Sequence, residues 1–142
     1  MLSSFFKQSL AKSLSFPKSR MSSSLAPIDA ARLTVVTTTA PKEKIANEKL
    51  VFGQSFTDHM LKIPFNTTSG WGAPEIVPYG PLALDPSCCV FHYAFELFEG
   101  LKAYKDNKGD IRRFRPDMNM ARMNKSADRI CLPTFDSEEV IK

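Results

Sequence analysis

Prolines at positions 74, 78, 81 and 86 are the feature that most constrains the fold of this chain. Proline lacks a backbone N–H and cannot continue a helix, so this stretch must consist of turns and edge strands. Residues 75–79 and 82–84 are therefore predicted to be short extended pieces. Upstream of the prolines, residues 51–56 and 59–63 predict two further strands separated by a bend.

The clearest helix signal covers residues 116–130. Pro116 suits a first helical turn, and Pro133 lies beyond the predicted end. Asp136, with a carboxylate three residues later, predicts the start of another helix, which has barely begun at Lys142. A helix so short is only marginally stable, so the chain is expected to be truncated. The buried stripe of the longer helix is predicted at Met120, Met123, Ala127 and Ile130.

Two more elements follow from local patterns. Residues 101–104 and 111–114 flank the turn-forming stretch 107–110, which predicts a hairpin. Residues 90–98 form the most apolar run, and we expect a strand that becomes a short helix ended by Gly100.

The net positive charge of the chain comes from its N-terminal end. Of 19 Lys and Arg residues, four lie in residues 1–28, which contain no acidic residue; the other 15 balance the 15 Asp and Glu. This end is also serine-rich and amphipathic, which is typical of a mitochondrial transit peptide. We predict a transit peptide over residues 1–21, a flexible segment over 22–50 and a folded domain over 51–142. A disordered tail is the alternative for the first stretch, and translation from Met21 would leave a cytosolic product.

Composition also argues against several classes of partner. No stretch of eighteen apolar residues occurs, so we expect no membrane span. The neutral body argues against nucleic-acid binding. The three cysteines, Cys88, Cys89 and Cys131, form neither a CxxC pair nor a Cys/His spacing. We therefore expect no metal site and interpret the cysteines as small apolar filler side chains.

The candidate binding residues are arginines, since no self-sufficient catalytic motif is present. Arg115, Arg122 and Arg129 are spaced by seven and would share one face of the predicted helix. A guanidinium on such a face can hold a phosphate through two hydrogen bonds. A solvated basic face is the alternative, and the spacing alone does not separate the two.

Longer strings add a family resemblance that runs in order from Val51 to the last residue. They resemble the branched-chain aminotransferases, class IV of the pyridoxal-phosphate enzymes. The strings are FGQSFTDHM (52–60), GWG (70–72), FHY (91–93), LFEGLKA (97–103) and FRPDMNMARM (114–123), continued by Ser126, Ala127, Arg129 and residues 131–133.

The resemblance implies a fold and an activity. The fold would be the small N-terminal α+β domain of the two-domain fold-type IV proteins, which include D-amino acid aminotransferase. The activity would be transfer of the amino group of leucine, isoleucine or valine to 2-oxoglutarate, giving glutamate and a branched 2-oxo acid. The cofactor would be pyridoxal 5'-phosphate, and the full-length enzyme would be a homodimer in the mitochondrial matrix.

The resemblance also assigns roles to individual residues. Arg122 matches the arginine that grips the cofactor phosphate, and Tyr93 matches a tyrosine at the substrate site. Phe52 and Phe98 match aromatics that wall the pocket for the branched side chain. Ordinary core packing is the alternative for these three aromatics. The lysine that forms a Schiff base with the cofactor lies downstream of Lys142 in the family, so no catalytic residue is assigned and this chain alone is expected to be inactive.

Three rival functions remain. A sibling class IV enzyme acting on D-amino acids or aminodeoxychorismate is the nearest. A non-catalytic basic matrix protein could bind RNA, which would show as a strong inverse dependence of affinity on salt. A decoy subunit could pair with the full-length enzyme. The arginines available for RNA are Arg112, Arg113, Arg115, Arg122 and Arg129.

Overall fold

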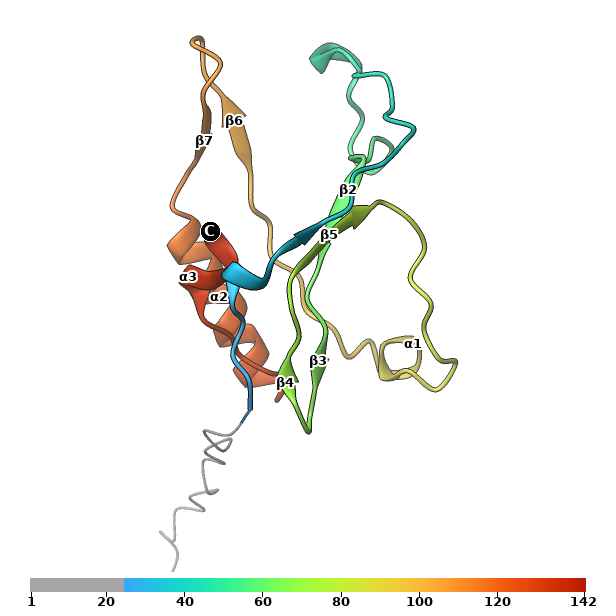
Figure 1. The fold of residues 1–142 in the computed structure, drawn as a ribbon, viewed down its shortest axis with the longest axis vertical. Coiled ribbons are helices and arrows are strands. Elements are labelled where there is room, and N and C mark those ends of the chain that lie inside the picture. The colour runs from blue at the N-terminus through green and yellow to red at the C-terminus, as the bar shows by residue number, and fades with distance from the viewer. Residues whose placement is uncertain (1–24) are drawn as a thin grey trace, which may run out of the picture.

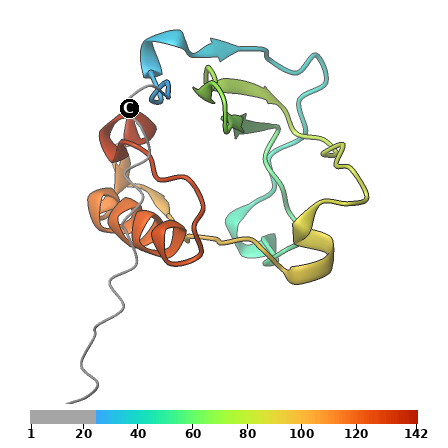
Figure 2. The same ribbon diagram turned by 90° about the horizontal axis from the view of Figure 1, so that it is seen from below.

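The computed structural model describes residues 25–142 (Figure 1). The transit peptide predicted over residues 1–21, with the alternative start at Met21, lies outside the described residues. The described part is a small mixed α/β domain, which confirms the predicted class at that level. Figure 2 shows the strands of residues 34–78 on one side and the helices of residues 116–141, with the hairpin of residues 103–113, on the other, joined by extended chain.

The central sheet has three strands in the order β1-β5-β2. Strand β5 (Glu75–Pro78) lies in the middle, parallel to β1 (Thr34–Val35) and antiparallel to β2 (His59–Lys62). Strand β5 carries the β-branched Ile76 and Val77, which suit a pleated, half-buried surface. Its proline is the last residue of the strand, where the missing N–H disturbs the ladder least.

Two hairpins extend from this body. Strands β3 (Phe65–Asn66) and β4 (Gly70–Trp71) form a short one, and β6 (Ala103–Lys105) and β7 (Ile111–Arg113) form a longer one. The longer hairpin confirms the prediction for this stretch. Its turn is held by Asp106, whose Oδ1 accepts hydrogen bonds from two backbone amides of the turn at 2.9 Å each.

Helix α2 (Pro116–Arg129) and helix α3 (Ser137–Ile141) pack against each other (Figure 1). Both begin where the sequence predicts, α2 with proline in its first turn and α3 with the Asp136 carboxylate accepting from the Glu138 amide at 2.9 Å. Three smaller elements complete the fold: the 3-10 turns η1 (Ala30–Arg32) and η2 (Asn47–Lys49) and the short helix α1 (Cys89–Tyr93).

The apolar core is small and lies beside α2. The buried apolar side chains of the described residues are Ile28, Met120 and Ala127. Met120 and Ala127 belong to the predicted stripe, whereas Met123 and Ile130 are only half-buried. Two of the three buried side chains thus belong to α2, and the third precedes the first strand.

Several local predictions were wrong. Residues 90–98 were expected to run from strand to helix, but helix α1 comes first and extended chain follows it. Ala94 ends that helix in the left-handed conformation, so the expected stop at Gly100 is wrong. Residues 51–56 form turns around Gly53, whose φ is +75°, and residues 82–84 form no strand.

The segment expected to be flexible over residues 22–50 contributes to the packed body. Strand β1 pairs with β5, and Ile28 is buried. The amide of Ala30 also donates to Glu139 Oε2 on α3 at 2.8 Å. The predicted domain boundary near Leu50 stays a prediction, but residues 26–36 pack with the sheet and helices.

The three cysteines are unpaired. Their interpretation as small apolar filler side chains is wrong for Cys89 and Cys131, which are exposed. Cys131 directly follows the C-cap of α2 with a φ of +58°, so it belongs to the turn that leaves the helix.

Candidate functional site

Arg122 projects from the middle of α2 and is paired with Glu99. Its Nε donates to Glu99 Oε2 at 3.2 Å, and its Nη2 donates to Glu99 Oε1. Asn119, one turn earlier on the same helix, donates from Nδ2 to Glu99 Oε1 at 2.9 Å and to the Gly100 carbonyl at 2.7 Å. The extended chain after α1 is thereby fixed against the face of α2 that bears Arg122.

The electrostatics of this pair keep both groups charged. Hydrogen bonds from Arg122 and then from Asn119 lower the pKa of Glu99 below its ordinary value. Hydrogen bonding to Glu99 in turn raises the pKa of Arg122. The Glu99 side chain is 11% exposed, whereas that of Arg122 is 60% exposed, so the arginine faces solvent and the carboxylate lies behind it.

Arg122 lines a hollow of about 600 Å³ that is rich in positive charge. The described residues that line it include no carboxylate. An open site with convergent cationic donors and aromatic walls is suited to a small anion that carries a ring. The lining residues that bear on this chemistry are Phe52, Lys102, Tyr104, Arg115, Asn119 and Arg122.

The structure brings together only some of the residues that the sequence singles out. Phe52 and Arg122 line the same hollow. Tyr93 is the last residue of α1 and Phe98 lies in the extended chain after it; neither lines the hollow, and both are largely exposed. Their substrate-site roles stay predictions.

The expected row of three arginines on one helical face is only partly correct. Arg115 is the N-cap of α2, with a left-handed φ of +46°, and reaches the hollow from outside the helix. Arg129 is the last residue of α2 and does not line the hollow. Of the other arginines available for RNA, Arg112 pairs with Asp106 at 2.7 Å, and Arg113 donates to the Ile141 carbonyl at 2.8 Å. These contacts leave no continuous row of free guanidinium groups.

Glu99 and Asn119 belong to this site but were not predicted from the sequence. Asn119 lies three residues before Arg122, so helical spacing could have placed the two on one face. No local signal pairs Glu99 with Arg122, because the two lie 23 positions apart in the chain.

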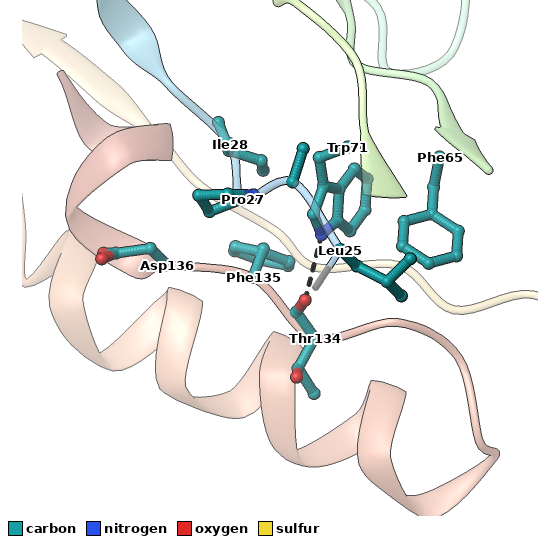
Figure 3. Close-up of a pocket in the computed structure, with 9 residues that line it drawn as sticks. Leu25, Pro27, Ile28, Phe65, Trp71, Thr134, Phe135 and Asp136 are labelled. Atoms are coloured by element: carbon teal, nitrogen blue, oxygen red, sulfur yellow. Dashed lines mark hydrogen bonds between the residues drawn. The ribbon is translucent and has the colours of Figure 1, made fainter. Parts of the chain in front are cut away.

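A second hollow, of about 230 Å³, lies where the N-terminal segment passes between the β3–β4 hairpin and the chain before α3 (Figure 3). The Trp71 indole N–H donates to the Thr134 carbonyl at 3.1 Å, and its ring meets the Phe135 ring edge-on at 6.1 Å (Figure 3). The one carboxylate in its lining, that of Asp136, caps α3. This hollow is therefore a packing junction that joins three segments.

Other kinds of site find no support in the part of the chain that the structure describes. Within residues 25–142, no group of three or more histidine, cysteine or acidic side chains is arranged to hold a metal ion. None of the helices in the same range has the length and apolar character needed to cross a membrane.

Comparison with known proteins gives matches to branched-chain-amino-acid aminotransferases. No protein-family model matches the chain. Over 117 residues, 82% of the chain, it is 65% identical to the mitochondrial branched-chain-amino-acid aminotransferase of Saccharomyces cerevisiae and 61% identical to the cytosolic one. It is 49% identical over 118 residues to the branched-chain-amino-acid aminotransferase of Monosiga brevicollis. The chain spans about 30% of the length of these relatives.

Proposed function

The chain is homologous to branched-chain-amino-acid aminotransferases over about 80% of its length, and we propose that it forms part of such an enzyme. The reaction is transfer of the amino group of leucine, isoleucine or valine to 2-oxoglutarate. The observation that carries the proposal is the 65% identity over 117 residues to a protein of that name. The cationic hollow at Arg122 supports it, since the reaction needs an anionic cofactor.

The residues of the hollow fit the phosphate of pyridoxal 5'-phosphate. Lys102, Arg115 and Arg122 supply positive charge from one lining, and Tyr104 and Phe52 supply ring surface beside it. Glu99 engages the Nε and Nη2 donors of Arg122, and Nη1 has no hydrogen-bond partner among the described residues. The edge of the guanidinium that bears Nη1 is therefore available to a phosphate oxygen.

When bound, the cofactor supplies an electron sink for chemistry at the substrate α-carbon. The residues of this chain bind and orient. Arg122 holds the phosphate end and so fixes the position of the cofactor ring. Phe52 and Phe98 form an apolar wall that favours branched aliphatic side chains over charged ones. Tyr93 offers a ring face and a hydroxyl that orient the substrate. The group that moves the proton is not assigned to this chain.

The finer parts of the proposal concern fold family, assembly and location. We assign the described residues to the smaller domain of a two-domain fold-type IV enzyme, which the mixed α/β content supports. The full-length enzyme is proposed to be a homodimer. The relatives include mitochondrial and cytosolic forms, and the basic, serine-rich residues 1–21 favour the mitochondrial matrix. RNA binding and a decoy role gain no support.

The test uses a full-length enzyme in which residues 25–142 replace the corresponding part of the Saccharomyces cerevisiae mitochondrial relative. We expect this chimera to form glutamate from leucine and 2-oxoglutarate. Arg122→Ala should weaken its affinity for pyridoxal 5'-phosphate by about 10- to 100-fold, because charge-assisted hydrogen bonds contribute about 1.5–3 kcal/mol. Arg129→Ala, on the same helix but outside the hollow, is the matched control and should leave that affinity unchanged.

Two outcomes would overturn the proposal. The first is a chimera that folds, yet transaminates none of the three branched-chain amino acids, while the native relative does. The second is an Arg122→Ala enzyme whose cofactor affinity equals that of Arg129→Ala. The second outcome would remove the phosphate site but leave the family relationship intact.

A further inference from the structure

Glu99 is an anion that lies behind the lining of a cation-rich site, hydrogen-bonded to two of the lining residues. Its side chain is 11% exposed, and its two oxygens accept three hydrogen bonds from two side chains of α2. A carboxylate this well shielded costs free energy unless it is paired, and here the pairing is complete. Its partner Arg122 remains 60% exposed and lines the hollow that Glu99 itself does not line.

The geometry of the pair determines the orientation of the guanidinium. A carboxylate that accepts from Nε and from Nη2 grips one edge of this planar group and so fixes both its plane and its rotation. An arginine side chain has several freely rotating bonds, so an exposed arginine without such a partner samples many rotamers. Asn119 donates hydrogen bonds to the same carboxylate and to the Gly100 carbonyl, and these two contacts fix the position of Glu99 in turn.

We propose that Glu99 is a positioning residue for cofactor binding, which holds the Arg122 guanidinium so that its Nη1 side faces the hollow and the phosphate it receives. This inference rests on the proposed function, since it names the residue that prepares the phosphate site. Glu99 acts through Arg122 and touches neither the cofactor nor the substrate. Asn119 is the second anchor of the same arrangement.

Repulsion of the phosphate by Glu99 would have the opposite effect on cofactor binding, and two substitutions distinguish repulsion from positioning. A carboxylate next to Arg122 also repels a phosphate, so it could act as a competing anion that weakens binding. Glu99→Asp retains the charge and withdraws the carboxylate by one methylene, which disrupts the fixed geometry without increasing repulsion. Glu99→Gln retains the length and removes the charge, which relieves repulsion. Positioning predicts a loss in the aspartate variant, and competition predicts a gain in the glutamine variant with no loss in the aspartate variant.

The experiment measures dissociation constants of the chimeric enzyme for pyridoxal 5'-phosphate and for pyridoxal, which lacks the phosphate. We expect Glu99→Asp to weaken binding of the phosphate ester by about tenfold, a loss of one well-placed charge-assisted contact, and to leave binding of pyridoxal unchanged. Asn119→Ala should give a smaller loss of the same kind. Asp106→Glu is the matched control, because it changes the length of an acid that is paired with Arg112, and neither residue lines the hollow.

A double-mutant cycle shows whether Glu99 acts through Arg122. In an Arg122→Ala background, Glu99→Asp should cause no further loss of phosphate-ester affinity. The inference is overturned if Glu99→Asp leaves the ratio of the two dissociation constants unchanged. An equal loss of affinity for both aldehydes is one such outcome. If Arg122→Ala itself leaves the ratio unchanged, the phosphate site of the proposed function has failed instead. Asn119→Ala keeps the test open should the Glu99 variants fold poorly.

Discussion

Replacement of Gly70 by alanine tests how the N-terminal segment is joined to the rest of the fold. Gly70 has a φ of +85° and is buried against the backbone of Ala26. A Cβ at this position would lie 2.5 Å from the Ala26 carbonyl oxygen, closer still to its amide nitrogen, and 2.9 Å from the Leu25 carbonyl carbon. These are backbone atoms, so they cannot yield by a rotamer change.

The expected loss can be worked out from two terms. An alanine in the left-handed region costs about 1–2 kcal/mol. The collision would also separate two backbone hydrogen bonds, Ala26 N–H to Ser69 at 3.1 Å and Trp71 N–H to Ala26 at 2.8 Å, which contribute about 1 kcal/mol each. Gly70→Ala should therefore lower the free energy of unfolding by about 3–4 kcal/mol.

Gly53→Ala is the matched control. Gly53 also has a positive φ, +75°, but a Cβ there would meet no atom within 4 Å. It should lose only the conformational term, about 1–2 kcal/mol. Urea unfolding followed by the fluorescence of Trp71, the single tryptophan, measures both variants. The reasoning is refuted if Gly70→Ala costs no more than Gly53→Ala.

The other predictions concern α2 and its contacts. Met120→Ala should lower the free energy of unfolding by about 2–3 kcal/mol because the side chain is 6% exposed, whereas Met118→Ala, 43% exposed on the same helix, should cost well under half as much; equal losses in urea would contradict the assigned core. Asn124→Ala removes hydrogen bonds to both backbone groups of Phe135, at 2.9 and 3.0 Å, and should cost about 1–2 kcal/mol and speed amide exchange at that residue. The lowered pKa of Glu99 means that its stabilising contribution is present above the ordinary value of 4.5 and is lost as pH falls through the folded-state pKa; unfolding curves of wild type and Glu99→Gln should therefore converge in acid, and a constant gap down to pH 3 would contradict this.

Elements with local signals were predictable from the sequence. The hairpin of β6 and β7 follows from the turn-forming residues 107–110, whose side chain and backbone contacts lie within the turn itself. Helix α2 begins at Pro116, and α3 begins after Asp136, because capping chemistry acts on the next few residues only.

Elements that depend on distant partners were not predictable. Strand β1 has only two residues, and it exists because β5, some forty positions later, offers an edge for parallel pairing. Residues 90–98 are apolar enough for either strand or helix, and periodicity cannot separate these for a short run. The left-handed Ala94 decides the outcome by ending α1 after Tyr93, which no residue type in that stretch announces.

The residues of the candidate site were likewise predictable from the sequence only in part. Helical spacing and the family strings both point to Arg122, because the arginine and its helix lie in one continuous stretch of sequence. The partner Glu99 lies on a separate segment, and only the folded chain brings its carboxylate to the guanidinium. The pairing is therefore a tertiary property of the site, which the residue types of the two segments do not specify.

The exposed aromatic side chains define how much of a binding pocket this chain can supply. Ile28 and Met120 are buried, whereas Phe52 and Phe98 lie almost wholly in solvent. A pocket that selects branched aliphatic side chains must enclose them on several sides, and soluble proteins rarely leave clustered aromatics uncovered. The chain spans about 30% of the length of its relatives, so under the proposed function the facing walls would come from the rest of the full-length enzyme. Under the proposed function, the described residues supply the phosphate side of the site at Arg122 and one aromatic wall at Phe52 and Phe98.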